Sequence, residues 1–574
     1  MKTKKILDYS IFIIDYLTSM IEHISYLFVV ASLVVFLAVF DEKIIVLLLD
    51  YIFIYVLFFQ IIKNIYFSIK NTIIFKKTSI QINLFIYTLL YLVYKEIVYV
   101  EFDFKDYYAT FFLTTRFIIY FIYLFLNRKN IKDYFKIIKL NPYQSFTIGF
   151  IFLILLGSLL LKLPVSYNGH LSFLDSLFTS TSAVCVTGLT VVNTSDFTFF
   201  GKIILLILIQ LGAIGIMTFT SFLAIISGSI SKTFDRLKSE EIYSETSFKK
   251  LKRLIKFIVI STFTIEIFCA IFIFISIKTE NINVENPIFF SIFHSISAFS
   301  NAGFSTLPNN LIQFYNIIPF NLIIMILIVL GGLGFPVTLN LIEKIKRETK
   351  LSLNTKIVLI TTFILIITGT LGFYLFEKEN LSKYNSVDRI LISLFQSVTS
   401  RTAGFNTIDI SNLSVTTYLL LIFLMFVGAS PSSTGGGLKT TTLFLLIFGT
   451  YLMIRKKDTP YIFKKKISPS YFYLAGSFLF IRILILFIAI TILSLTEKFD
   501  IIKIVFESVS ALSTVGLSTG ITPELSTSGK TVIILLMLIG RIGPLKFLSS
   551  FVKTENPNKV RTKIEYLQEN IVMD

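Results

Sequence analysis

The sequence contains no tryptophan, only two cysteines and three histidines, and few charged residues for its length. Cys185 and Cys269 cannot build a disulfide framework, and no CxxC pair or Cys/His cluster suggests structural zinc. Charged residues fill 15% of the 574 positions and hydrophobic residues 54%, whereas globular domains are about a quarter charged. Because a disordered chain is poorer in apolar residues, the composition leaves a multi-pass membrane protein.

Apolar runs long enough to cross a bilayer recur along the chain. A span needs about 20 mostly apolar residues, because hydrocarbon offers no partner for a free backbone amide. This criterion predicts twelve spans, at 10–40, 44–62, 79–94, 107–127, 140–161, 203–231, 254–277, 319–342, 357–376, 416–452, 470–495 and 529–551.

Basic clusters fall in alternate loops between these spans. The chain is expected in the cytoplasmic (inner) membrane. Since Lys and Arg are held on the cytoplasmic side, both termini are expected in the cytoplasm. The net charge of +18 then reflects topology and attraction to anionic membrane lipids rather than a nucleic-acid surface.

Four segments share the pattern F-x-S-x-[ST] followed by glycine nine or ten residues after the phenylalanine. A second glycine follows the first at an offset of 24 or 28 residues. Each motif predicts a half-helix of about ten residues, which is too short to cross and must enter the membrane and return. The first glycines are Gly188, Gly303, Gly404 and Gly516, and the second are Gly212, Gly331, Gly428 and Gly540.

The expected fold is therefore an all-α polytopic membrane protein. Four tandem repeats of helix, re-entrant pore loop and helix would surround a pseudo-fourfold pore, preceded by about four extra N-terminal transmembrane helices. The expected divisions are an N-terminal extension, four pore repeats and a cytoplasmic C-terminal tail, at 1–139, 140–250, 251–350, 351–466, 467–551 and 552–574.

The four glycine turns predict a cation selectivity filter. Glycine permits backbone angles that turn successive carbonyls toward one axis, where they could replace the hydration shell of a cation. The half-helices also direct their negative dipole ends at this axis, which favours a cation over an anion. The predicted coordinating residues are Val186, Thr187, Gly188, Asn301, Ala302, Gly303, Thr402, Ala403, Gly404, Thr514, Val515 and Gly516.

A glycine-rich stretch interrupts the second long helix of the third repeat. Three consecutive glycines (Gly435, Gly436, Gly437) and Pro431 cannot continue an α-helix cheaply, at about 1 kcal/mol for each glycine and about 3 for proline. This break, with Lys439 just after it, predicts a flexible gate loop across the permeation path. A packing bend is the alternative. A nucleotide P-loop is disfavoured, since the adjacent Gly-Lys and a preceding strand are absent.

Several charged residues fall at membrane depth and need a role. Arg541 is expected to line the cavity below the filter, where it would tether the glycine-rich loop or repel cations; a structural salt bridge is the alternative. Arg401 and Glu507 are predicted to pair behind the filter, or else each to cap loop carbonyls or amides separately. The roles of Glu266 and Arg482 stay open.

The strings TSAVCVTGLT, SAFSNAGFST, SVTSRTAGFNT, SALSTVGLSTG, LGGLGFP, SPSSTGGGLKTTT and GRIGPL resemble the Trk/Ktr/HKT superfamily of potassium and sodium transporters, most closely Ktr pore-forming subunits, over about 140–551. The resemblance implies K⁺ as transported ion, an intramembrane gate loop and a homodimer. It also implies a KtrA-like cytoplasmic nucleotide-binding regulatory subunit as partner, which alone would hold nucleotide. Glycine at all four filter positions favours potassium, because serine at the first accompanies sodium permeation in plant relatives.

Three functions are weighed on this basis. The first is potassium uptake without a covalently bound cofactor or catalytic residue, since the chain has no Walker motif and no phosphorylated-aspartate signature. The second is a sodium or weakly selective monovalent cation transporter, and Na⁺ as a stimulating ion is a related possibility. The third is a multi-pass membrane enzyme, for which only His170, His294 and scattered glutamates are available. His294 is expected to be a packed polar residue rather than a catalytic base.

Overall fold

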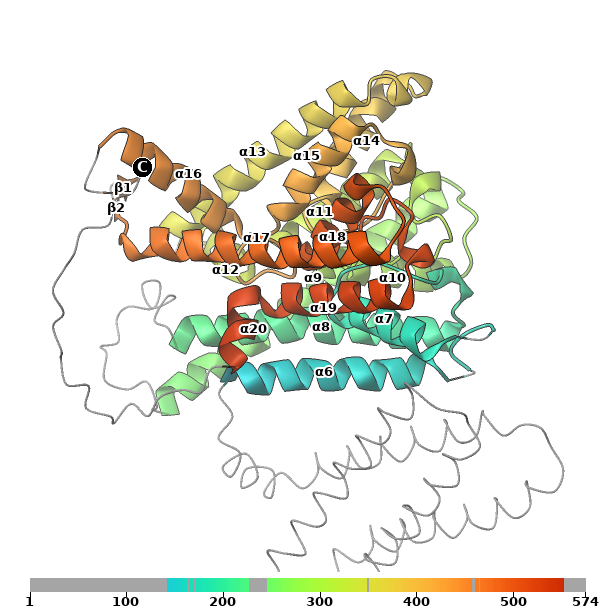
Figure 1. Ribbon diagram of the computed structural model, residues 1–574, viewed down its shortest axis with the longest axis horizontal. Helices are drawn as coiled ribbons and strands as arrows, with labels where there is room; N and C mark the ends of the chain where they lie inside the picture. The colour runs from blue at the N-terminus through green and yellow to red at the C-terminus, as the bar shows by residue number, and fades with distance from the viewer. Residues whose placement is uncertain are drawn as a thin grey trace, which may run out of the picture. The chain divides into compact units, whose positions relative to one another are not determined.

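The computed structural model describes residues 142–163, 165–169, 171–226, 245–347, 350–456, 460–463 and 465–551. The predicted N-terminal extension with its four spans, His170 and the C-terminal tail lie outside these ranges. The described part is almost entirely helical, with one antiparallel hairpin formed by β1 (Tyr461–Ile462) and β2 (Lys465–Lys466) (Figure 1).

The described helices follow one another in a repeating order of long and short. They are α6 (Pro142–Leu161), α7 (Phe173–Val184), α8 (Phe199–Ile226), α9 (Glu245–Thr279), α10 (Pro287–Ser300), α11 (Ile318–Leu333), α12 (Phe335–Ile345), α13 (Leu353–Phe376), α14 (Ser386–Thr399), α15 (Val415–Phe426), α16 (Thr440–Ile454), α17 (Ser470–Thr496), α18 (Ile501–Ser513), α19 (Thr527–Ile542) and α20 (Pro544–Phe551). Short 3₁₀ turns lie at Thr194–Asp196, Ile312–Phe314, Asn380–Lys383, Ile410–Asn412 and Thr522–Glu524.

Five of the described helices are long and apolar enough to cross a membrane, namely α6, α8, α9, α13 and α17. The count becomes six if α11 and α12 form one bent span. Figure 1 shows α6, α8, α17 and α19 running in roughly the same direction. Large apolar side chains cover the outward faces, for example Phe363 at 65% and Phe480 at 67% exposure, as expected for surfaces that meet lipid.

The predicted spans at 319–342 and 529–551 are each interrupted by a break that the sequence analysis did not anticipate. The first is broken at Gly334, where α11 and α12 meet at 103°, and the second at Gly543, between α19 and α20. Both glycines have positive φ, 86° and 95°, and a proline follows within two residues. Glycine in this conformation ends the first helix, and proline, which lacks an N–H, is well suited to the first turn of the next.

The glycine-rich stretch breaks the predicted 416–452 span as expected. Helix α15 ends at Phe426 and α16 begins at Thr440. We call the intervening residues 427–439 the glycine loop.

A four-part arrangement recurs along the described chain: a long helix, a short helix, a loop and a second helix. The short helices are α7, α10, α14 and α18, with 12, 14, 14 and 13 residues. The second helix of each part packs on the short helix of the next: α8 on α10, α11 on α14, α15 on α18, and α19 on α7. The last of these contacts closes the four parts into a cycle.

The motif phenylalanines anchor the short helices in the core. Phe178, Phe293, Phe395 and Phe506 are all at most 1% exposed. Burying a phenylalanine side chain contributes about 1.5–3 kcal/mol. The first residue of each motif therefore fixes its short helix between the longer ones.

Candidate ion-conduction site

The four motif glycines meet in a closed ring, which we call the glycine ring. A β-carbon added to Gly188 would lie 3.3 Å from the Cα of Gly303. The corresponding distances are 2.9 Å from Gly303 to Gly404, 3.1 Å from Gly404 to Gly516, and 3.0 Å from Gly516 back to Gly188. Segments far apart in the sequence are thus brought together, and the crowding leaves no room for a side chain at any of the four glycines.

A backbone carbonyl oxygen lies against each glycine of this ring. The atom nearest to a β-carbon added at each glycine is the carbonyl oxygen of the residue that precedes the neighbouring glycine. These four oxygens belong to Thr187, Ala302, Ala403 and Val515. All four residues are among the predicted coordinating positions, and no carboxylate is needed to make the ring electronegative.

The backbone around the ring is left-handed at two positions in every part. The glycines have φ of 92°, 68°, 81° and 97° in chain order. The residues two positions earlier also have positive φ: Val186 at 54°, Asn301 at 60°, Thr402 at 78° and Thr514 at 50°. Three of these are β-branched, for which this conformation is an outlier. Such strain costs about 1–3 kcal/mol per residue and is typical of functional sites.

Hydrogen bonds at the ends of the short helices hold this conformation. Just after the end of α7, the N–H of Val186 donates to Ala183 O at 3.1 Å and that of Thr187 donates to Ser182 O at 2.8 Å. The ends of α10 and α18 repeat both bonds. Carbonyls at the carboxyl ends of three short helices are therefore satisfied by the residues that turn toward the ring.

The last hydroxyl of the F-x-S-x-[ST] motif binds the turn directly. Ser182 Oγ accepts from the N–H of Gly188 at 3.0 Å, and Ser510 Oγ accepts from that of Gly516 at 3.2 Å. In the other two parts the hydroxyl donates to the carbonyl after the glycine, at 2.8 Å from Ser297 to Phe304 and 2.7 Å from Thr399 to Phe405.

The middle serine of the motif ties the short helix to the long helix before it. Ser180 donates to Ile154 O at 2.6 Å, Ser295 to Glu266 O at 2.6 Å, and Ser397 to Ile366 O at 2.8 Å. Ser508, in the fourth part, bonds within its own helix instead. The motif hydroxyls therefore explain why serine and threonine recur at this depth.

The position between the phenylalanine and this serine supports the loop that follows the glycine. His294 Nε2 lies 3.0 Å from Ser305 Oγ, and Gln396 Nε2 lies 3.4 Å from Thr407 Oγ1. The side chain of Glu507 occupies the same place in the fourth part. The role of Gln396 was not predicted, and the polar residue that stands at this motif position in all four repeats is the signal that could have revealed it. His294 is fully buried and its ring packs against that of Phe290, as expected for a packed polar residue.

The predicted pair between Arg401 and Glu507 is wrong. Arg401 Nη2 donates to Gly428 O at 3.3 Å. Glu507 accepts from Ser518 Oγ at 2.6 Å, Thr519 N at 2.9 Å and Thr522 Oγ1 at 2.9 Å. Donors in the loop that follows Gly516 satisfy the carboxylate of Glu507, so the alternative of separate capping is the one observed.

The glycine loop lies directly against the residues that precede the glycine ring. A β-carbon added to Gly435 would lie 3.2 Å from Thr402 Cβ, and one added to Gly436 would lie 3.1 Å from the carbonyl carbon of Ser513. The N–H groups of Ser430 and Thr434 donate to the carbonyls of Gly332 and Gly331 in α11, at 3.0 and 3.2 Å. The loop therefore contacts three of the four parts of the fold.

Basic side chains bind the carbonyls of the glycine loop. Arg541, which was expected to line the cavity below the filter, donates to Thr434 O of the glycine loop and, at 3.1 Å, to Gly212 O in α8. Lys439 Nζ donates to Gly435 O at 2.7 Å and to the next carbonyl at 3.3 Å. Together with Arg401 at Gly428, these cations bind carbonyls at the beginning and in the middle of the loop.

The second glycines allow the returning helices to approach the short helices. A β-carbon at Gly212, Gly331 or Gly540 would collide with the backbone of Val184, Phe299 or Leu512 respectively. Each of these three residues lies four positions before a ring glycine. In the third part, a β-carbon added to Gly428 would instead collide with the backbone of Gly436 and lie 2.6 Å from Gly437 Cα, both within the glycine loop. This close packing explains the sequence offsets.

An open vestibule of about 290 Å³ lies next to the glycine ring, and all four ring glycines line it. Asp409 is the one charged residue among those that line this vestibule. Its carboxylate accepts from Ser411 Oγ at 2.7 Å and from Asn412 Nδ2 at 2.8 Å, which fixes its position at the wall. The vestibule therefore carries a fixed negative charge.

Glu266 and Arg482 do not pair in the described structure. Glu266 in α9 accepts from Gln210 Nε2 at 2.9 Å, whereas Nη1 of the buried Arg482 in α17 has no hydrogen-bond partner. Among the described residues, no group of three or more His, Cys, Asp or Glu side chains could hold a metal ion.

Comparison with known proteins identifies the family. The family model of TrkH, described as a cation transport protein, matches residues 117–561. The Ktr system potassium uptake protein B of Bacillus subtilis (strain 168) is 38% identical over 427 residues, covering 74% of this chain and 96% of the relative. The potassium/sodium uptake protein NtpJ of Enterococcus hirae is 35% identical over 445 residues, covering 76% and 98%.

A solved structure shares the fold. The crystal structure of the potassium transporter TrkH from Vibrio parahaemolyticus matches 82% of this chain and 96% of that chain, with a TM-score of 0.63 and 20% identity. The chain belongs to the TrkH family of cation transport proteins and is a multi-pass membrane protein.

Proposed function

We propose that this chain takes up potassium across the cytoplasmic membrane through the glycine ring. One observation supports this proposal best: the four ring glycines are in contact, and a backbone carbonyl oxygen lies against each of them. The potassium uptake activity in the name of a relative 38% identical to the chain points the same way.

The carbonyls of the ring residues replace the hydration shell of the ion. The four ring positions are glycines, which have no side chain, so the main chain supplies the ligands. The short helices end next to the ring and direct the negative ends of their dipoles toward it, which stabilises a cation there. No carboxylate of the described residues is required in the ring itself, and the charge of Asp409 acts at the vestibule.

The glycine loop is the gate in this proposal. It lies against Thr402 and Ser513, which precede the ring, and it lacks the regular hydrogen bonds of a helix. Arg541 and Lys439 hold it by its carbonyls and place positive charge beside the path. Release of Arg541 from Thr434 would remove the hydrogen bond that joins the middle of the loop to α19.

Ions move inward because the cytoplasmic potential is negative, with both termini in the cytoplasm. We further propose that the chain works as a homodimer with a KtrA-like cytoplasmic subunit, which binds nucleotide and regulates the gate. The Ktr system named in the relative from Bacillus subtilis supports a multi-component assembly. Basic inner loops and the tail at 552–574 are the proposed docking surfaces.

Rubidium influx into liposomes that contain the purified chain tests this function. We expect uptake that external K⁺ inhibits more strongly than Na⁺ does. Gly303→Ser should abolish this preference or the flux, because a β-carbon there lies 2.9 Å from Gly404 Cα. Absence of rubidium uptake by the wild-type chain would overturn the proposal.

A sodium or weakly selective pathway is the second candidate. The four parts of the ring differ in their side chains, and one relative is named a potassium/sodium uptake protein. Equal inhibition of rubidium uptake by Na⁺ and K⁺ would favour this candidate over a potassium-selective one.

A further inference from the structure

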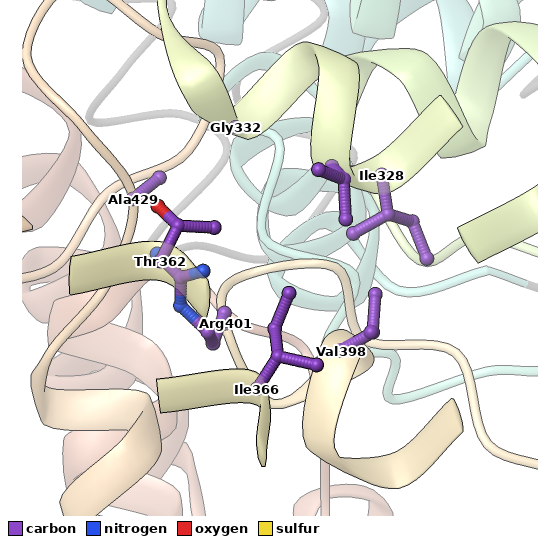
Figure 2. Close-up of a pocket in the computed structure, with 8 residues that line it drawn as sticks. Ile328, Gly332, Thr362, Ile366, Val398, Arg401 and Ala429 are labelled. Atoms are coloured by element: carbon purple, nitrogen blue, oxygen red, sulfur yellow. The ribbon is translucent and has the colours of Figure 1, made fainter. Parts of the chain in front are cut away.

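A small cavity lies beside the start of the glycine loop, between α11, α13 and α14 (Figure 2). Its volume is about 10 Å³, and most of its lining is apolar. Arg401, which follows α14, and Thr362, in the middle of α13, are the polar side chains that line it. A space of about 10–15 Å³ accommodates one water molecule and nothing larger.

Both polar side chains leave a buried atom without a partner. Arg401 is 8% exposed and Thr362 is 6% exposed. The Nη2 atom of Arg401 is bonded to Gly428, but its Nε has no hydrogen-bond partner, and neither does Thr362 Oγ1. Buried polar groups that lack a protein partner are usually satisfied by ordered water. Figure 2 shows the guanidinium directed to the side of the cavity where Thr362 and Ala429 lie.

We propose that this cavity binds one ordered water molecule, which accepts a hydrogen bond from Arg401 Nε and donates one to Thr362 Oγ1. Arg401 lies three residues before the ring glycine Gly404 and also donates to Gly428 O at the start of the glycine loop. The water therefore links both segments to α13. Its effect on gating rests on the proposed function, but the water site itself does not.

A structure at a resolution that shows ordered waters tests the site, using the wild-type chain and Gly332→Ala. Gly332 lines the cavity, and a β-carbon there would make ordinary contacts, 3.5 Å from Asn301 Nδ2 and 3.8 Å from Ala429 Cβ, so an added methyl narrows this water-sized space without a collision. We expect water density within hydrogen-bond distance of Arg401 and Thr362 in the wild type and none in Gly332→Ala. Gly476→Ala, at an open position, should keep it. An empty wild-type cavity, or density that persists in Gly332→Ala, would overturn the site.

Rubidium influx tests the coupling to the gate. Thr362→Val keeps the shape of the side chain but removes its hydroxyl, and we expect it to change the influx rate several-fold. Thr362→Ser should restore the wild-type rate. Thr361→Val is the matched control, since Thr361 is also buried but does not line the cavity. Equal rates in Thr362→Val and Thr361→Val would refute the coupling. A wild-type chain that carries no rubidium would instead refute the proposed function and leave the density test standing.

Discussion

Left-handed backbone at single residues is what lets four segments meet at one point. Of the residues two positions before the ring glycines, only Asn301 is of a type that visits this conformation readily. Val186, Thr402 and Thr514 adopt it against their preference, so the sequence alone did not reveal them. Their conformation is imposed by the helix ends and by the neighbouring parts of the ring, which are long-range features.

The lack of space at the ring gives a prediction for Gly404→Ala. The residue has φ of 81°, and its β-carbon would lie 3.1 Å from Gly516 Cα and strike the Val515 carbonyl. We expect rubidium influx to be lost at unchanged membrane abundance. Gly149→Ala is the control, because nothing lies within 4 Å of a β-carbon there. Normal influx through Gly404→Ala would show that the ring is not the path.

Asp409 gives a prediction about ion capture. Its fixed charge at the vestibule raises the local cation concentration, so Asp409→Asn should raise the KM for rubidium with little change in the maximal rate. The increase should shrink in strong salt, because the screening length falls from about 10 Å at 0.1 M to about 3 Å at 1 M. Asp500→Asn is the control, since Asp500 is exposed and does not line the vestibule. A KM change that is independent of salt would contradict this role.

At the scale of elements, the returning helices are broken in three of the four parts. The break in the third part follows from its three glycines and proline, and the sequence predicted it. The breaks at Gly334 and Gly543 each depend on one glycine with positive φ before a proline. A single glycine is often tolerated inside an apolar helix, so hydropathy alone did not distinguish these from continuous spans.

The hydrogen bonds of Arg541 to the glycine loop and to α8 give a testable prediction. Arg541→Gln removes a positive charge and a donor to Thr434 O and Gly212 O, so the glycine loop loses its link to α8 and α19. We expect basal rubidium influx to rise several-fold in liposomes without a regulatory subunit. Arg455→Gln, at the exposed end of α16, should leave the influx unchanged. A decrease or no change in Arg541→Gln would argue against the tether.

At the scale of the whole described molecule, cyclic packing determines the site. The repeated motifs were enough to predict which glycines belong together, because four copies of one motif with nearly equal spacings do not arise by chance. They were not enough to assign polar partners. Arg401 and Glu507 carry opposite charges near the predicted filter, yet each forms hydrogen bonds with nearby loop atoms. Which partner each side chain reaches depends on the tertiary packing, which the sequence pattern does not give.

The contact between the fourth and first parts closes the cycle and includes an ion pair. Lys530 in α19 lies 2.7 Å from Asp175 in α7, and the two side chains are 17% and 20% exposed. A double-mutant cycle with Lys530→Met and Asp175→Asn should give a coupling of up to about 1 kcal/mol in thermal stability in detergent, since the pair is partly shielded from solvent. Strictly additive effects would mean that the pair contributes nothing to closure.

The most direct test is an experimental structure of the chain with rubidium, whose anomalous scattering locates the ion. Our account predicts a peak on the axis between Gly188, Gly303, Gly404 and Gly516, within coordination distance of the carbonyl oxygens of Thr187, Ala302, Ala403 and Val515. A transport-competent preparation with bound rubidium elsewhere and none at this ring would contradict it.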